Sequence, residues 1–94
     1  MNIAVLTLHL HLPMCQSLKE KRSRIKPLLY RIHKEFNLST AEIGLNDHWQ
    51  EGMVACALVS NDANHAHRVL QQVVEFIPTC FPDLEIIDFH IENI

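Results

Sequence analysis

The order in which two hydrophobic periods follow each other most constrains the fold of this chain. Residues 3–12 alternate between two kinds of side chain with a period of two, which is typical of a strand with one buried face. Residues 18–36 instead place apolar side chains three or four positions apart, the spacing of an amphipathic helix. The later patterns indicate a strand, a strand, a helix and a strand over residues 39–45, 53–60, 66–77 and 84–94.

The resulting order, β-α-β-β-α-β, predicts an α+β fold of the ferredoxin-like type. With right-handed crossovers, the four strands form an antiparallel sheet in the order 4-1-3-2, and both helices cover one face. The 94 residues are enough for one such domain, which spans residues 1–94. In this topology, the beginning of the first helix lies at the same end of the sheet as the connection over residues 46–52.

The first helix carries its own boundary signals. Ser17 is a good N-cap and Glu20 completes a capping box, while Asn37 is suited to end the helix. Pro27 falls on the solvent side, where it should bend or divide the helix. The last strand is expected to direct three apolar side chains toward the core, namely Ile87, Phe89 and Ile91.

Positive charge is concentrated in the first helix. Seven of the eight Lys and Arg residues lie between Lys19 and Lys34, and only Arg68 lies elsewhere. Residues 17–35 therefore carry a formal charge of +5, whereas the rest of the chain carries −8. A local basic surface of this kind can attract an anionic partner even when the whole protein is acidic.

We predict that this basic helix contacts the phosphate backbone of RNA. Five of the seven cations fall on the predicted outer side, but Lys21 and Arg22 flank the apolar stripe, where they must snorkel or pair with Asp47 or Glu51. Trp49 is either a platform for base stacking or a packing residue. The alternative for the whole helix is an ordinary solvated face. The predicted nucleic-acid-binding residues are Lys19, Lys21, Arg22, Arg24, Lys26, Arg31, Lys34 and Trp49.

The predicted sheet face away from the helices carries small apolar residues. None of the expected positions on its central strands is Phe, Tyr or Trp, so the base-stacking mode of RNA-recognition motifs is not expected there. A flat face of small apolar residues suits protein packing, and we predict a homodimer through it. The predicted dimer face consists of Val5, Thr7, Ala55, Ala57 and Val59.

The sequence predicts no catalytic motif, cofactor or metal site. The chain has two glycines and no glycine-rich phosphate loop, and its three cysteines form no C-x-x-C pair. The one conceivable nucleophile is Cys15, near basic residues, with His48 as its base. His9 and His11 share a strand face, but a third metal ligand is not evident.

Several short blocks in order resemble the small YlxP-like bacterial family, whose function is unknown. They include Leu-Thr-Leu-x-Leu-x-Leu-Pro over residues 6–13, Ser-Leu-Lys-Glu-Lys-Arg over 17–22 and Ala-Glu-Ile-Gly over 41–44. Asp-His-Trp-Gln over 47–50 and Val-Ser-Asn-Asp over 59–62 continue the match, which spans essentially the whole chain. The resemblance implies a ferredoxin-like fold and no established activity. Its members are often encoded beside translation initiation and ribosome-maturation factors, which implies an association with RNA or the ribosome.

Together these features favour a binding module rather than an enzyme. No segment is apolar enough to span a membrane and no signal peptide is evident, so we expect the cytoplasm as the compartment. The leading prediction is an accessory protein that binds RNA or a ribosomal subunit through the basic helix. The alternative is a homo-oligomeric module that docks an acidic protein partner without nucleic acid.

Overall fold

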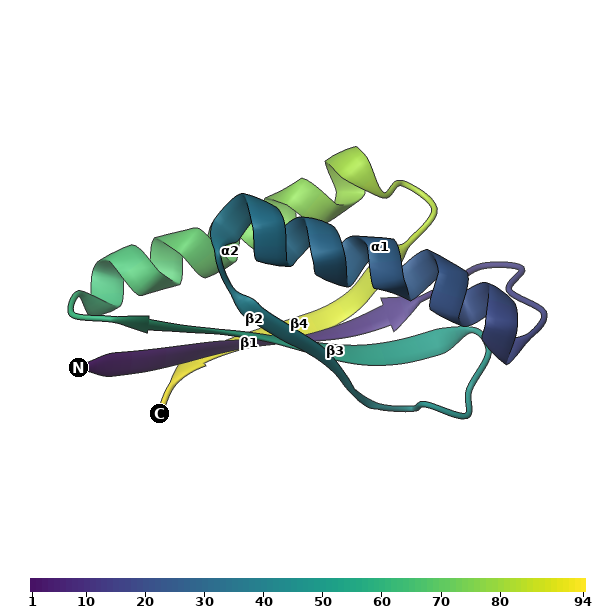
Figure 1. Ribbon diagram of the computed structural model, residues 1–94, viewed down its shortest axis with the longest axis horizontal. Helices are drawn as coiled ribbons and strands as arrows, with labels where there is room; N and C mark the ends of the chain where they lie inside the picture. Colours follow the sequence, from purple (N-terminus) through teal and green to yellow (C-terminus); the bar gives the residue numbers. More distant parts are fainter.

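The computed structural model describes residues 1–94 and has the predicted order of elements. The strands are β1 (Asn2–His11), β2 (Ser39–Gly44), β3 (Glu51–Ser60) and β4 (Glu85–Asn93), and the helices are α1 (Leu18–Phe36) and α2 (Ala63–Cys80). The antiparallel sheet has the order β2-β3-β1-β4, which is the predicted order read from the other edge. Figure 1 shows both helices on one face of this sheet, with the two chain ends close together. The predicted ferredoxin-like fold is confirmed.

The core lies between the sheet and the two helices. The even-numbered side chains of β1 from Ala4 to Leu10 are fully buried, as the alternation predicts. They pack against stripes of buried apolar residues on the helices, at Ile25, Leu28 and Ile32 of α1 and at Ala66, Leu70, Val73 and Ile77 of α2. Neither helix contains a stretch long and apolar enough to cross a membrane.

The ends of α1 form as predicted, with one difference in the capping box. Ser17 Oγ accepts a hydrogen bond from the Glu20 N–H at 3.0 Å, but the Glu20 carboxylate accepts from the Gln16 N–H rather than from the N-cap residue. Asn37 ends the helix in the left-handed conformation, with φ 56°, which asparagine tolerates better than most residues. The helix continues through the exposed Pro27 without a division.

The edge strand β2 presents its polar side to the helices. Glu42 pairs with the buried Val54, so its side chain faces α1, and the Thr40 hydroxyl donates to the Leu29 carbonyl. Ala41 pairs with Ala55 and therefore lies on the opposite face of the sheet. The apolar side of this strand consequently adds to the uncovered face and not to the core.

The prediction for β4 is wrong at Ile87. The register between β1 and β4 shifts between His9 and Leu10, so that Asp88 pairs with His9 and Ile86 pairs with Leu10. Phe89 pairs with the buried Leu8 and lies on the helix side of the sheet as predicted, although it is 40% exposed at the sheet edge. Ile87 is the extra residue of this irregularity and is exposed. Ile86 packs on the core in its place, together with Ile91 as predicted.

Candidate nucleic-acid interface

The seven cations of α1 separate into those held by the rest of the protein and those that are not. Lys21, Arg24 and Arg31 have carboxylate partners within 3.3 Å. Lys19, Arg22 and Lys26 are exposed and form no ion pair. Lys34 is also exposed, and its ammonium lies 5.8 Å from the centre of the Tyr30 ring, a cation–π contact on the same outer face.

The prediction of Lys21 as a phosphate contact is wrong, because its side chain is only 2% exposed. Its ammonium lies 2.9 Å from Glu42 Oε2 and donates a 2.6 Å hydrogen bond to the Leu45 carbonyl. The buried Glu42 oxygen has no well-directed hydrogen bond, so the contact between the two side chains is an ion pair. Gly52 packs directly against this pair, since a Cβ there would lie at an ordinary contact distance of 3.6 Å from Lys21 Cε.

Arg24 is likewise a structural residue and not part of a free outer surface. Its guanidinium donates to Asp83 Oδ2 at 3.2 Å, to the Asp83 carbonyl at 2.6 Å and to the Pro13 carbonyl at 3.0 Å. These bonds join the connection after β1 to the connection before β4. Arg24 was predicted to face outward, but the loop after α2, which contains Asp83, covers that flank of α1.

Arg31 also turns toward the second helix. It donates to Glu35 Oε1 at 3.3 Å, and its guanidinium carbon lies 5.4 Å from the centre of the Phe76 ring on α2. Asp47 and Glu51, the partners predicted for Lys21 and Arg22, do not pair with either of them. The pairing of Lys21 with Glu42 was missed, although the position of Glu42 on the polar side of its strand is a signal for it.

The three unpaired cations share one face of the helix. Lys19, Arg22 and Lys26 are separated by three and four residues, the spacing of neighbours on a helix surface. Seven residues at about 1.5 Å per residue extend over about 10 Å of the helix axis. Lys19 lies in the first turn, where unpaired backbone N–H groups add partial positive charge. The arrangement can therefore bind an extended anion such as a phosphate backbone.

Trp49 lies at the same end of the molecule as the beginning of α1. The connection that carries it is attached there by the bond from the Leu12 N–H to the Gln50 carbonyl at 2.8 Å and by Gln50 Nε2 donating to the Cys15 carbonyl at 3.3 Å. The Trp49 side chain is 52% exposed and makes no aromatic or cation–π contact. About half of its surface is therefore open to an external partner.

The structure does not activate Cys15 as a nucleophile. Burial raises the pKa of its thiol, and the neighbouring Glu20 carboxylate raises it further. The thiol donates to the Ser17 carbonyl at 3.5 Å, while His48 is exposed and forms no side-chain hydrogen bond. A protonated thiol is a weak nucleophile, so the predicted Cys15–His48 pair lacks the chemistry it requires.

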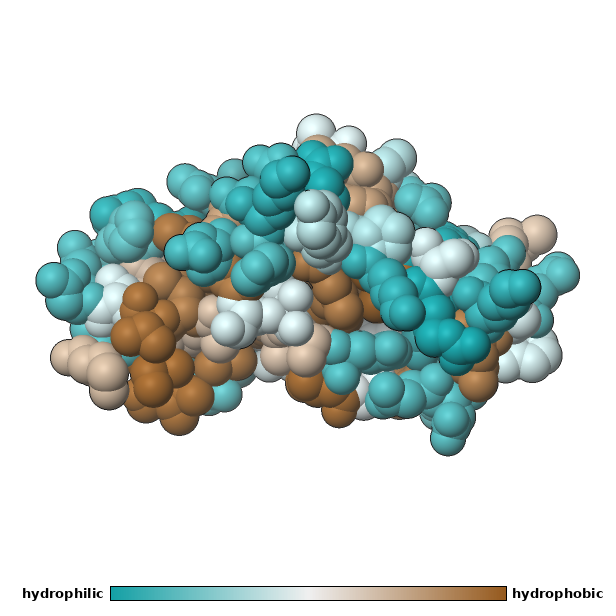
Figure 2. Space-filling model, in the orientation of Figure 1, coloured by the Kyte–Doolittle hydropathy of each residue, from teal (hydrophilic) through white to brown (hydrophobic).

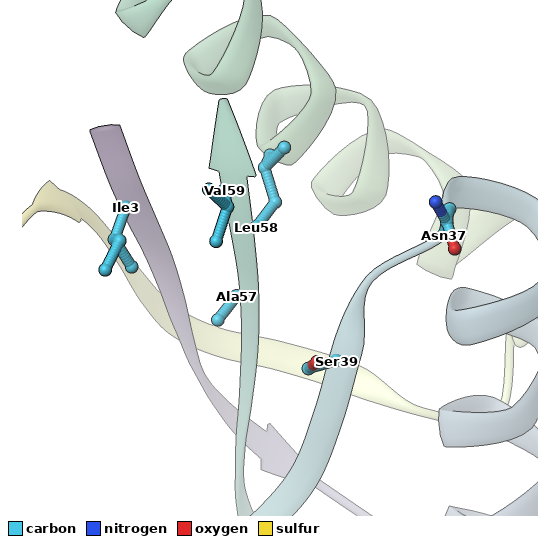
Figure 3. A pocket seen from close by; sticks show the side chains of 6 residues that line it. All are labelled: Ile3, Asn37, Ser39, Ala57, Leu58 and Val59. Atoms are coloured by element: carbon cyan, nitrogen blue, oxygen red, sulfur yellow. The ribbon is translucent and has the colours of Figure 1, made fainter. Parts of the chain in front are cut away.

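The five residues predicted as a dimer face do share the uncovered face of the sheet. Val5 pairs with Ala57 and Thr7 with Ala55, and Val59 lies opposite Ile3. Figure 2 shows a hydrophobic patch at the lower left, on the side of the molecule away from the helices. An open cavity of about 290 Å³ adjoins it, lined by Ile3, Asn37, Ser39, Ala57, Leu58 and Val59. None of these side chains titrates, and Figure 3 shows Ile3, Ala57 and Val59 directed to the same side of the sheet.

The histidines of this face bind carboxylates. His9 Nε2 lies 2.8 Å from Glu51 Oε1, and His11 Nδ1 lies 3.2 Å from Glu85 Oε2. His90 pairs with Thr7 on the neighbouring strand and lies on the same face. No three histidine, cysteine or acidic side chains are grouped in a way that could hold a metal ion.

Comparison with known proteins identifies the family. A family model described as a protein of unknown function (DUF503) matches residues 3–91. The uncharacterized protein YlxP of Bacillus subtilis (strain 168) is 42% identical over 69 residues, which cover 73% of this chain and 74% of that protein. The de novo designed protein Foldit4 matches 98% of this chain and 96% of its own with a TM-score of 0.55, and its 15% identity shows the fold alone. The predicted resemblance is thus confirmed, and the chain belongs to the YlxP-like family of proteins of unknown function, DUF503.

Proposed function

We propose that this protein binds RNA, alone or in a ribosomal subunit, through the outer face of α1. The observation that carries the proposal is the group of three exposed cations, Lys19, Arg22 and Lys26, which no carboxylate of the protein neutralises. Exposed cations on one helix face match the geometry of a phosphate backbone, whose contacts supply most of the affinity in non-specific binding. The three cysteines are free, which agrees with a reducing compartment such as the cytoplasm.

Trp49 extends this proposed surface. Its exposed ring lies in the connection that is attached next to the beginning of α1. Stacking of an unpaired base on such a ring contributes about 1–3 kcal/mol, which would favour single-stranded or loop regions of RNA. Lys34 adds a fourth exposed charge further along the helix.

Titration of fluorescently labelled structured RNA over a series of salt concentrations tests the proposal. The triple variant Lys19→Gln, Arg22→Gln, Lys26→Gln should bind more weakly and reduce the slope of log K against log salt by about 2–3, since each phosphate contact contributes about 0.7 on a single strand and about 0.9 on a duplex. Lys26→Gln and Arg68→Gln form a matched pair, because each removes one exposed charge from a helix. Equal effects of the two single variants, or an unchanged slope in the triple variant, would reject the proposed site.

The same cations would also fit an acidic protein, which is the alternative function. Salt dependence does not separate the two partners, because both contacts are electrostatic. Nuclease treatment of the captured complex does separate them, since association through RNA is lost and association through protein survives. Binding assays with purified ribosomal subunits and with free RNA then show whether the protein binds RNA alone or RNA within a subunit.

A further inference from the structure

We infer that the uncovered face of the sheet binds a second copy of this chain, forming a homodimer of two stacked sheets. The inference is independent of RNA binding, because α1 lies on the other side of the sheet (Figure 1). It extends the five predicted residues to the neighbouring apolar positions on the same face. The proposed dimer face consists of Ile3, Val5, Thr7, Ala41, Met53, Ala55, Ala57 and Val59.

The orientation of the β2 side chains supports a protein contact on the uncovered face of the sheet. The strand packs Glu42 against α1 and leaves Ala41 on the uncovered side, opposite Ala55. Ile43, the extra residue at the register shift between Glu42 and Gly44, is 54% exposed. A strand register shifted by one residue would exchange these faces and remove apolar side chains from water. Val59, 64% exposed, adds to the same surface. An apolar surface retained in this way is typical of a contact with another protein.

The size of the face suits a dimer. The longest strands, β1 and β3, have ten residues each, and four strands stand side by side. The four strands together have 35 residues, so at about 3.4 Å per residue and about 4.8 Å between strands the face covers about 570 Å² in projection. A standard interface buries about 800 Å² of accessible surface on each partner. The accessible surface of the face is larger than its projected area, because side chains protrude from the sheet, so the face is large enough for such an interface. Alanines at three positions on β2 and β3 allow a second sheet to approach to the usual distance of about 10 Å.

The distribution of charge favours a second copy over nucleic acid. The β4 side of the face is acidic, with Glu85, Asp88 and Glu92 next to histidines of β1 and β4, and would repel phosphate. A two-fold axis that runs along the strands between β3 and β1 places each β4 over the partner's β2, because the strand order is β2-β3-β1-β4. The two acidic sides are then kept apart, and the apolar residues of β3 lie over those of β1.

Sedimentation velocity between 5 and 500 µM tests the dimer. The wild type should sediment at about twice its monomer mass of 10.9 kDa at the higher concentrations. Ala57→Glu places an unpaired charge in the middle of the face and should weaken association at least about 100-fold. Tyr30→Lys, an exposed substitution on the outer side of α1, should leave the dimer unchanged.

Circular dichroism shows whether the Ala57→Glu variant is folded. If it is not, Val59→Lys serves in its place, because Val59 is largely exposed in the single chain and tolerates a charge. A wild type that stays monomeric at 500 µM would overturn the inference. A dimer that both face variants leave intact would overturn it as well, since association would then use another surface. Loss of the dimer only in the face variants supports it.

Discussion

Replacing Lys21 with methionine should destabilise the protein by about 3 kcal/mol. The substitution keeps most of the aliphatic volume but removes the ammonium, leaving Glu42 without its cation and the Leu45 carbonyl without its donor. Removing one partner of a buried ion pair costs about 3–5 kcal/mol, because the other charge stays desolvated. The Glu42 side chain is 19% exposed and can draw in some water, so we expect the lower end of this range.

Urea denaturation followed by Trp49 fluorescence and by circular dichroism measures this loss. A thermal melt gives a second measure. For a domain of 60–100 residues, each kcal/mol lowers the melting temperature by about 4–8 °C, so a loss of 3 kcal/mol corresponds to about 12–24 °C. Lys19→Met is the matched control, because it removes an exposed and unpaired cation from the same helix. That substitution should change stability by less than about 0.5 kcal/mol.

The double variant Lys21→Met, Glu42→Leu decides whether the lost ion pair is the cause. With both charges removed, no buried ion remains unpaired, and the stability should return to within about 1 kcal/mol of the wild type. A single variant as stable as the wild type would refute the reasoning. A double variant no more stable than the single one would also refute it, because the loss would then come from packing around Gly52 and not from charge.

Two further predictions concern stability. Burial raises the pKa of Cys56 to about 12 from its ordinary 9.0. Because the unfolded thiol ionises first, the free energy of unfolding should fall by up to about 1.4 kcal/mol per pH unit between these values. Denaturation at several pH values should show a steeper fall in the wild type than in Cys56→Ala, which keeps only the contribution of the buried Cys15 thiol, whose pKa is also raised; equal slopes would contradict it. Met14→Gly should stabilise by about 0.5 kcal/mol, since the 78% exposed Met14 has φ 64°. A thermal melt showing a loss would reject strain at Met14.

The elements were predictable because their signals are local. The alternation of β1 and the cap at Ser17 depend on neighbours a few residues away, and the structure reproduces both. The register of β4 was not predictable, because the shift opposite His9 is set by pairing with a strand about 80 residues earlier in the chain. One extra residue there exchanges the faces of the side chains before it, which is why Ile86 and not Ile87 reaches the core.

The candidate site was predicted only in outline, for a related reason. A helical projection gives the angle of each side chain, but it does not show what the rest of the fold places at that angle. Arg24 binds Asp83, 59 residues further along the chain, and Lys21 binds Glu42 on a strand whose polar side faces inward. Both contacts depend on where a second part of the chain packs against α1, which a helical projection does not show. The concentration of charge in α1 was evident, whereas its division between inner and outer contacts was not.

That division explains how an acidic protein can present a basic surface. The rest of the chain carries −8, and carboxylates from β2 and from the loop before β4 neutralise cations of α1 that turn toward them. Lys19, Arg22 and Lys26 are exposed and form no ion pair, so their charge remains available to an external anion. The same reasoning applies to the sheet, where the apolar residues that the core does not use lie together on the opposite face. The exposed cations of α1 and the apolar face of the sheet therefore lie on opposite sides of the fold. A dimer formed through the sheet face would leave the basic surfaces of both copies exposed.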